Sequence, residues 1–201
     1  ENLGVKTDID WESVESLQSP ADRVNWFRAA EYCNKLSELE GIPKDQWCFA
    51  VNEDGEYDWG MTLKPNFHQL RGYRIPTREE RLYAGRCHAN TRYFFGEPGD
   101  LADEYAWYAS NSLGIARDVC HFPPNGFGIF DIHGNVWEYP LVPNGLGTDG
   151  IVSAKCLLKL RSGAVNSGVS VITLTSYTSP CSPTYVSHNY GFRLAKSLPS
   201  K

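Results

Sequence analysis

The pattern of apolar and polar residues predicts a first helix near the start of the chain. Asn25 is placed to cap a helix from Trp26 to about Leu39, and Gly41 follows where a glycine commonly ends a helix. Four positions at helical spacing form its expected apolar face: Phe27, Ala30, Cys33 (or Asn34) and Leu36. We therefore expect an amphipathic helix over these residues.

A capping box predicts a second helix. Thr77 and Glu80 have the spacing at which threonine and glutamate side chains cap each other's backbone, and the helix should continue to about Arg86. Between the two helices, residues 42–72 lose the helical periodicity and are rich in Pro, Gly, Asn and aromatic residues. This stretch indicates a long ordered loop with a short hairpin around Asp54-Gly55.

The remainder of the chain predicts an α+β fold of one domain. From Asn90 onward, short β segments alternate with turns rich in Gly and Pro, and neither a βαβ pattern, a GxGxxG motif nor a P-loop occurs. The expected architecture is two helices in a loop-rich β scaffold with little regular secondary structure. We assign residues 1–23 to a lead-in or truncated element, 24–195 to the domain and 196–201 to a tail.

Composition and charge exclude several classes of protein. The 201 residues are 41% hydrophobic and 21% charged, which is close to the average for globular proteins and excludes disorder, collagen and coiled coil. The formal charge of −5, without a basic cluster, argues against nucleic acid as the partner. The six cysteines contain no CxxC pair, so a zinc ribbon is not expected and buried free thiols are favoured over bridges.

Neither a membrane span nor an export signal is visible. No run of about 18 apolar residues exists, and the N-terminus lacks the basic-then-apolar profile of a signal peptide. We therefore expect no membrane partner. The chain begins at Glu1 rather than Met, so a missing targeting segment or N-terminal domain stays open and the localisation is undefined.

Three stretches carry the pattern of a known family, in the family's order along the chain. They are Tyr73–Ala84 (YRIPTREERLYA), Phe122–Glu138 (FPPNGFGIFDIHGNVWE) and Gly191–Leu194 (GFRL). Together they resemble the formylglycine-generating enzyme (sulfatase-modifying factor) family over roughly residues 24–195. The resemblance implies a fold related to that of C-type lectins.

The resemblance also implies structural calcium. The positions that match the family's first calcium site are the side chains of Asp131 and Glu138 and the carbonyls of Gly134 and Val136. Oxygen atoms at alternating positions around a glycine turn suit such a hard cation, while a salt-bridged turn is the alternative. A second site should begin near Asn111 and Ser112, although the loop after them looks shortened.

The family's copper chemistry is not expected here. Members that make formylglycine hold copper(I) with two cysteines four residues apart, shortly after an Arg-Gly-Gly-Ser stretch, and thiolates suit this soft ion. The matching stretch here is Arg161–Ala164 (RSGA), and no cysteine follows between Val165 and Pro180. The family's Glu-Trp-Glu-Tyr motif also reads Glu80 to Tyr83 with Arg81 in place of the tryptophan. The prediction therefore leans away from an enzyme, with no catalytic residue assigned.

The segment Ser162–Tyr190 contains 29 residues and not one Asp, Glu, Lys or Arg. It also lacks Gln, Met and Trp, which resembles the variable region of diversity-generating retroelement proteins, where a C-type lectin scaffold displays a randomised ligand-binding face. Two alternatives stay open: buried β strands, such as residues 169–174, and decay of an unused active centre. The natural contact residues are Tyr177, Tyr185, His188 and Tyr190, because tyrosine offers a large amphipathic surface.

The leading hypothesis is a non-catalytic ligand-binding module that presents residues 165–190 to a protein or peptide ligand. One alternative is a formylglycine-generating-type oxidase or a relative with altered chemistry. Another is a sensor domain fused to a kinase or protease. The sequence defines neither the ligand nor the oligomeric state.

Overall fold

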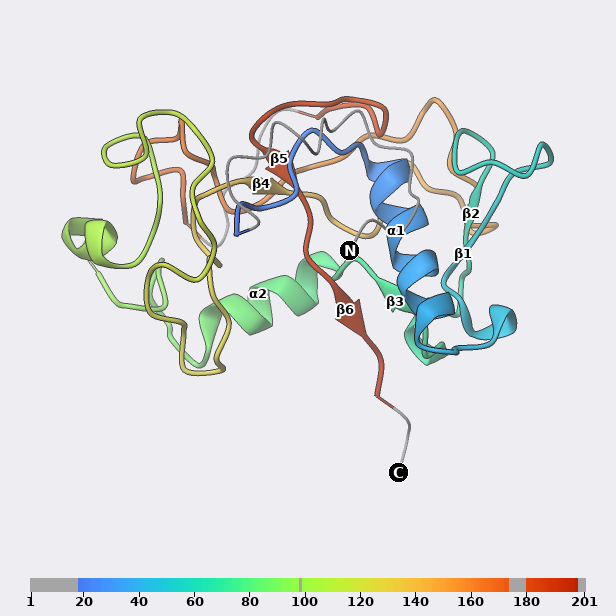
Figure 1. Ribbon diagram of the computed structural model, residues 1–201, viewed down its shortest axis with the longest axis horizontal. Coiled ribbons are helices and arrows are strands. Elements are labelled where there is room, and N and C mark those ends of the chain that lie inside the picture. The colour runs from blue at the N-terminus through green and yellow to red at the C-terminus, as the bar shows by residue number, and fades with distance from the viewer. Residues whose placement is uncertain (1–17, 98, 174–179, 199–201) are drawn as a thin grey trace.

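The computed structural model describes residues 18–97, 99–173 and 180–198. Two α-helices and three pairs of very short strands are embedded in long ordered loops, with 3-10 turns at Lys44–Gln46 (η1), Phe67–Gln69 (η2) and Gly99–Glu104 (η3) (Figure 1). The predicted fold class, two helices in a loop-rich scaffold with little regular secondary structure, is confirmed. Within the described ranges, no helix has the length and apolar character needed to cross a lipid bilayer.

The first helix, α1 (Trp26–Leu39), forms as predicted. Its first turn is capped by Asn25, whose Oδ1 accepts a hydrogen bond from the Arg28 N–H (2.9 Å), and Gly41 follows the helix with φ +68°. The buried face differs in detail from the prediction, because Trp26 is fully buried while Leu36 is only half-buried. The Trp26 indole N–H donates to the Pro140 carbonyl (3.0 Å), which accounts for the burial of its polar atom.

The second helix, α2 (Arg78–Arg86), is held at its start by the predicted capping box. Glu80 N–H donates to Thr77 Oγ1 (3.1 Å), and Thr77 N–H donates back to Glu80 Oε2 (2.8 Å). The same carboxylate also accepts two hydrogen bonds of 2.6 Å from the buried guanidinium of Arg74. One local signal therefore fixes both the start of the helix and its attachment to β3 (Tyr73–Arg74).

The strand pairs join distant parts of the chain. β1 (Phe49–Ala50) pairs antiparallel with β2 (Thr62–Leu63), and the loop between them contains the predicted Asp54-Gly55 turn. β3 pairs antiparallel with β6 (Ala195–Lys196), and β4 (Trp137–Glu138) pairs in parallel with β5 (Tyr190–Gly191). The last two pairs attach the C-terminal residues to the middle of the fold, as the position of β5 beside β4 in Figure 1 shows.

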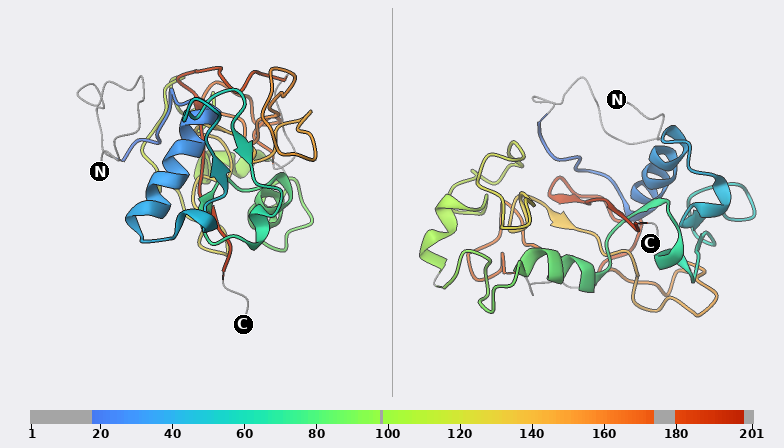
Figure 2. Two further views of the ribbon diagram at one scale, coloured as in Figure 1. Left: turned by 90° about the vertical axis from the view of Figure 1, so that its right-hand side faces the viewer. Right: turned by 90° about the horizontal axis from the view of Figure 1, so that it is seen from below.

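The interior contains two apolar clusters. The larger one packs α1 against β1, β2 and the residues that follow β4, and α1 lies beside β1 in the left view of Figure 2. The smaller cluster consists of Tyr93, Ala102, Ala106 and Ile172, with Phe95, Tyr108 and Val169 packed against it. Ile172 belongs to the uncharged segment, so this segment contributes to the core as well as to the surface.

Candidate functional site

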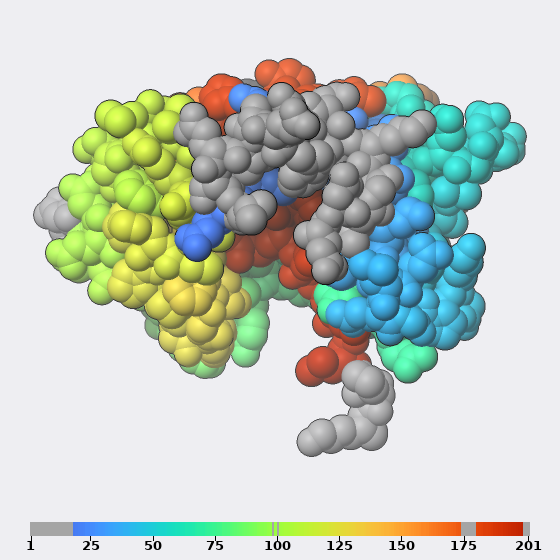
Figure 3. Space-filling view, in the orientation of Figure 1, coloured from blue at the N-terminus to red at the C-terminus, as the bar shows by residue number. Residues whose placement is uncertain are grey.

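The uncharged segment, residues 162–190, is described in two parts. Residues 180–190, coloured red, lie along the upper edge of the molecule in Figure 3. Residues 169–173 form turns and bends rather than a strand, so the buried-strand alternative is wrong for this described stretch. Tyr177, one of the predicted contact residues, lies outside the described residues.

The first residues of the segment are buried and fixed by backbone contacts. Ser162 and Gly163 have φ of +88° and +69°, and both are buried. Val165 N–H donates to the Asn135 carbonyl (2.9 Å), and Ala109 N–H donates to the Ser167 carbonyl (3.0 Å). The stretch that matches the family's copper region is therefore part of the packed interior.

Two of the predicted contact residues lie side by side. Tyr185 is 50% exposed, and its ring centroid lies 5.4 Å from that of the half-buried Tyr190. Tyr190 also packs edge-on against the buried Tyr139 (6.2 Å), whose hydroxyl is 3.0 Å from the Tyr185 carbonyl. His188 is exposed. The structure thus presents Tyr185 and His188 to solvent, while Tyr190 packs between Tyr185 and the buried Tyr139.

Sequence reasoning missed two asparagines that connect the two described parts of the segment. The Asn189 Nδ2 group donates to Asn166 Oδ1 (3.0 Å), and the Ser187 hydroxyl donates to Asn189 Oδ1 (2.6 Å). Asn189 is buried, whereas Asn166 is exposed. Nothing in their local spacing marks this contact, because 23 positions separate the two residues.

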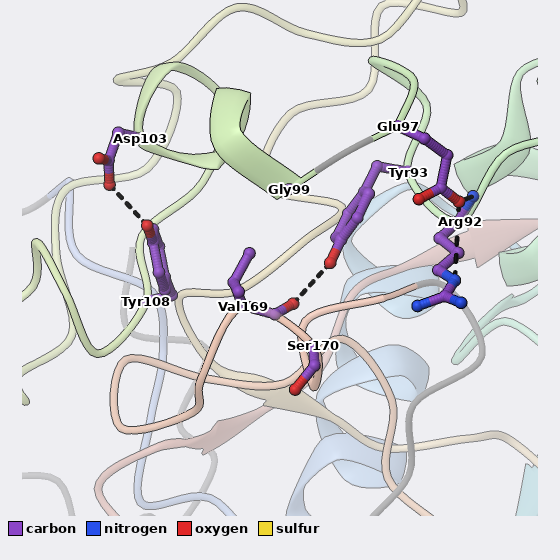
Figure 4. Close-up of a pocket in the computed structure, with 8 residues that line it drawn as sticks. All are labelled: Arg92, Tyr93, Glu97, Gly99, Asp103, Tyr108, Val169 and Ser170. Atoms are coloured by element: carbon purple, nitrogen blue, oxygen red, sulfur yellow. Dashed lines mark hydrogen bonds and ion pairs between the residues drawn. The ribbon is translucent and has the colours of Figure 1, made fainter.

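An open pocket of about 510 Å³ borders the uncharged segment (Figure 4). Its lining comprises Arg92, Tyr93, Glu97, Gly99, Asp103, Tyr108, Val169 and Ser170. The Tyr93 hydroxyl donates to the Val169 carbonyl (2.8 Å), and the Tyr108 hydroxyl donates to Asp103 Oδ1 (2.7 Å). Val169 and Ser170 therefore form one wall of a pocket whose other walls come from residues 92–108.

The turn predicted to hold calcium is a salt-bridged turn. Glu138 is buried, and its two carboxylate oxygens accept hydrogen bonds from Arg81 Nε (2.6 Å) and Arg193 Nε (2.8 Å). Burial alone would raise the pKa of Glu138, but the two guanidinium groups outweigh it and lower that pKa. The carboxylate is thus ionised and already paired, which is the alternative that the sequence left open.

The other residues predicted to hold this ion are also fixed within the fold. Asp131 Oδ2 accepts a hydrogen bond from the Cys120 N–H (2.8 Å). Gly134 has φ +73°, and a Cβ there would lie 2.0 Å from the Trp107 carbonyl oxygen, so this backbone is fixed by close contact. Val136 is buried. Among the described residues no three His, Cys, Asp or Glu side chains gather as metal ligands would, and both carboxylate oxygens of Glu138 already accept arginine donors.

The residues predicted to begin a second calcium site are used in local hydrogen bonds. Asn111 Oδ1 accepts from the Tyr108 N–H (3.0 Å), and its Nδ2 donates to the Ala106 carbonyl (3.0 Å). The buried Ser112 hydroxyl donates to the Val165 carbonyl (2.6 Å). These side chains link the 106–112 turn to the uncharged segment, and calcium at this position stays a prediction.

His133 is a buried link to the uncharged segment. Its Nδ1 lies 2.6 Å from the Ile172 carbonyl, and its Nε2 accepts a weak hydrogen bond from the Phe94 N–H (3.4 Å). A neutral ring that donates from Nδ1 satisfies both contacts. Burial disfavours the charged form of the ring and lowers the pKa of His133 to about 3. In the part of the chain that the structure describes, both ring nitrogens of this histidine contact backbone groups, so it acts as a structural hydrogen-bonding group.

The cysteines do not reproduce a copper(I) site. All six are free thiols, and Cys33, Cys48 and Cys156 are buried. Cys181 is half-buried, and burial raises its pKa to about 11, which disfavours the thiolate that copper(I) requires. The residues present therefore do not fit the family's metal.

Comparison with known proteins identifies the family. Residues 5–198 match the sulfatase-modifying factor enzyme 1-like domain family, so the chain belongs to it. The matched range includes most of the lead-in assigned to residues 1–23.

Two curated relatives and one solved structure are similar to most of the chain. Chaperone protein LppX of Paenibacillus barcinonensis is 27% identical over 147 residues, which is 61% of this chain and 51% of that protein. Inactive C-alpha-formylglycine-generating enzyme 2 of Mus musculus is 26% identical over 190 residues, which is 91% of this chain and 51% of that protein. This chain thus spans about half the length of these relatives.

The structure of Treponema denticola variable protein 1 superposes with a TM-score of 0.78 at 22% identity, covering 96% of this chain and 78% of that one. At this identity the likeness shows the fold.

Proposed function

We propose that this chain is a non-catalytic module that binds a protein or peptide ligand through a display face. The display face is defined as the exposed side chains of the described uncharged segment: Asn166, Ser170, Val171, Pro180, Thr184, Tyr185, Val186 and His188. The observation that carries the proposal is that this face bears no Asp, Glu, Lys or Arg, while surfaces elsewhere on the chain carry many. Such a face suits a partner that is recognised by shape, apolar contact and neutral hydrogen bonds.

The backbone beneath the display face is fixed independently of its side chains. Arg23 N–H donates to the Ser187 carbonyl (3.1 Å), Trp26 N–H to the Pro183 carbonyl (3.0 Å) and Trp137 N–H to the Asn189 carbonyl (2.7 Å). Backbone hydrogen bonds of this kind do not depend on which side chain the accepting residue carries. The exposed positions can therefore vary while the loop keeps its course, as a recognition surface requires.

The pocket beside the display face offers a place for one side chain of the ligand. Tyr93 and Tyr108 provide flat, largely fixed walls, because their hydroxyl groups are held by Val169 and Asp103. Ser170 adds a hydroxyl from the uncharged segment. Rigid tyrosine walls lose little conformational entropy on binding, which favours recognition of a folded or extended peptide.

The runner-up is catalysis of the family type or a relative with altered chemistry. It is disfavoured because no thiolate pair follows Arg161–Ala164 and because the one buried histidine of the region, His133, is held neutral. The mouse relative is named an inactive enzyme, which supports the proposal that a member of this family can keep the fold without the enzymatic activity. A further alternative, a sensor domain fused to a kinase or protease, concerns sequence outside this chain.

An assay of oxidation separates the module from the enzyme. The chain, with copper(I) supplied, is incubated with a Cys-Xaa-Pro-Xaa-Arg peptide, and aldehyde formation is followed by mass spectrometry with an active family member as positive control. We expect no aldehyde above the level of buffer with copper alone. Turnover that exceeds this background would contradict the proposal.

A library tests the display face directly. Ser170, Val171, Tyr185, Val186 and His188 are randomised in one displayed library, and the exposed Leu39, Val51, Val142, Ile151 and Leu157 in a control library. Hen egg-white lysozyme serves as the probe. Most display-face members should fold and yield specific lysozyme binders, whereas the control positions, which do not border the pocket, should yield few. Loss of folding in most display-face members would defeat the proposal.

We further propose that the segment is diversified by a retroelement, as its restricted composition and the likeness to a variable protein suggest. The test is the nucleotide sequence of the source replicon. A nearby near-identical template repeat of the codons for residues 162–190 is expected. A complete replicon without such a repeat would refute diversification and leave the binding module untouched.

A further inference from the structure

Two arginines enclose the carboxylate at the centre of the predicted calcium turn. We call Arg81, Glu138 and Arg193 the guanidinium clamp. Arg81 comes from α2 and is 3% exposed, Glu138 belongs to β4, and Arg193 follows β5. The two ion pairs thus join α2, β4 and the residue that follows β5, which are more than fifty residues apart in the sequence.

The clamp also holds the carbonyl groups of the turn. Arg81 Nη2 donates to the Ile132 carbonyl (2.6 Å), and Arg193 Nη2 donates to the Asp131 carbonyl (3.0 Å). Arg81 Nη2 additionally donates to the Ser162 hydroxyl, at the first residue of the uncharged segment. The two guanidinium groups therefore share one carboxylate, that of Glu138, and satisfy backbone oxygens of the turn at the same time.

Adding a cation to this arrangement is electrostatically unfavourable. The positive charges of Arg81 and Arg193 already balance the negative charges of Glu138 and Asp131. A calcium ion at Glu138 would add two positive charges beside two guanidinium groups in a buried region, where unpaired charge carries a large desolvation penalty. It would also have to displace the Arg81 and Arg193 donors from the two carboxylate oxygens of Glu138.

Arg81 stands at the position where the related enzymes carry the tryptophan of Glu-Trp-Glu-Tyr, so this chain brings a cation where a neutral ring is usual. We infer that the guanidinium clamp takes over, in this chain, the cross-linking of the 130–138 turn that the family resemblance assigns to calcium. The fold is then independent of calcium at this site. This inference stands apart from the binding proposal, because it concerns the scaffold alone.

The experiment compares the full chain with two arginine variants in calcium and in chelator. Arg81→Met removes the clamp cation and keeps the apolar stem. Arg74→Met is the matched control, because Arg74 is also 3% exposed but pairs with Glu80 rather than with a residue of the turn. Melting temperature and hydrogen exchange of residues 130–138 are measured at 2 mM calcium and at 2 mM EGTA.

We expect hydrogen exchange of the wild-type 130–138 turn to be the same in calcium and in EGTA. Arg81→Met should melt at least about 6 °C lower, since it leaves a buried carboxylate half-paired, and the 130–138 turn should exchange at least tenfold faster. Arg74→Met should destabilise the chain without this selective opening of the turn. In equilibrium dialysis against calcium, the wild-type chain and Glu138→Gln should bind the same number of calcium ions.

Two results would overturn the inference. One is a wild-type turn that exchanges faster in EGTA than in calcium, which would make calcium the cross-link. The other is a folded Arg81→Met variant whose 130–138 turn exchanges no faster than in Arg74→Met. If Arg81→Met does not fold, the calcium dependence and dialysis of the wild-type chain still decide the question.

Discussion

Replacement of single aromatic residues should separate the display face from the core. Trp137 is 6% exposed and lies in β4, so Trp137→Ala empties a packed site, and the expected loss of unfolding free energy is about 3–5 kcal/mol. Tyr185 is 50% exposed and packs on one side against Tyr190. Half of the usual gain from burying an aromatic side chain is about 1 kcal/mol, which is the loss expected for Tyr185→Ala.

The backbone contact of Tyr185 survives the substitution, because its carbonyl, which lies 3.0 Å from the Tyr139 hydroxyl, is retained in alanine. His188→Ala should change the stability by no more than about 0.5 kcal/mol, as is usual for an exposed residue. The assay is urea unfolding followed by tryptophan fluorescence for the tyrosine and histidine variants, and by circular dichroism for Trp137→Ala. The slope against urea should be unchanged, so that midpoint shifts report stability.

The refuting result is a loss for Tyr185→Ala or His188→Ala as large as that for Trp137→Ala. It would mean that residues 180–190 form core rather than surface, and the display face would lose its physical basis.

Three further measurements follow from the structure. Burial lowers the pKa of His133 to about 3 from 6.5, so on acidification the unfolded chain binds a proton before the folded chain does. The free energy of unfolding should therefore fall by about 1.4 kcal/mol per pH unit below about pH 6.5. His133→Asn should lose this pH dependence between pH 6.5 and 5, and an unchanged dependence would contradict the assignment. In a thiol titration of the native chain, the exposed Cys120 should react first, and Cys181, whose pKa is about 11, should react much later. The denatured chain should show six free thiols, and two or more disulfide bridges would refute this prediction. Gly134→Ala should lower the melting temperature far more than Gly41→Ala, because both have positive φ but only the first would drive a Cβ against a backbone carbonyl; equal shifts would show that the close approach does not matter.

The helices were predictable because their signals are local. Asn25 and the Thr77–Glu80 pair act on backbone groups within three or four residues, so the sequence alone specifies where each helix starts. The strand pairs were not predictable in the same way. β4 meets β5 across more than fifty residues, and two-residue strands have too little periodicity to be recognised.

The amino-acid composition predicted which segment forms the candidate site, but it did not predict which residues of the segment are exposed. The absence of charge marked residues 162–190 as unusual, yet it could not show that Ile172 is buried while Val171 beside it is exposed. The turn at Glu138 shows the same limit. A carboxylate beside a glycine turn is compatible with calcium or with arginine, and only the fold reveals that Arg81 and Arg193 reach it. The one available signal was the arginine in place of the family's tryptophan.

The attachment of α1 to the C-terminal part of the chain has a consequence for synthesis on the ribosome. Trp26 N–H bonds to the Pro183 carbonyl, so α1 finds this partner only after about 157 more residues have been made. At typical translation rates of about 5–20 residues per second, that interval is roughly 8–30 s. During it the apolar face of α1 lacks part of its final cover, and folding that depends on such distant contacts is slow. The packing of α1 is therefore completed late in synthesis, later than in a helical bundle of equal size, whose contacts are more local.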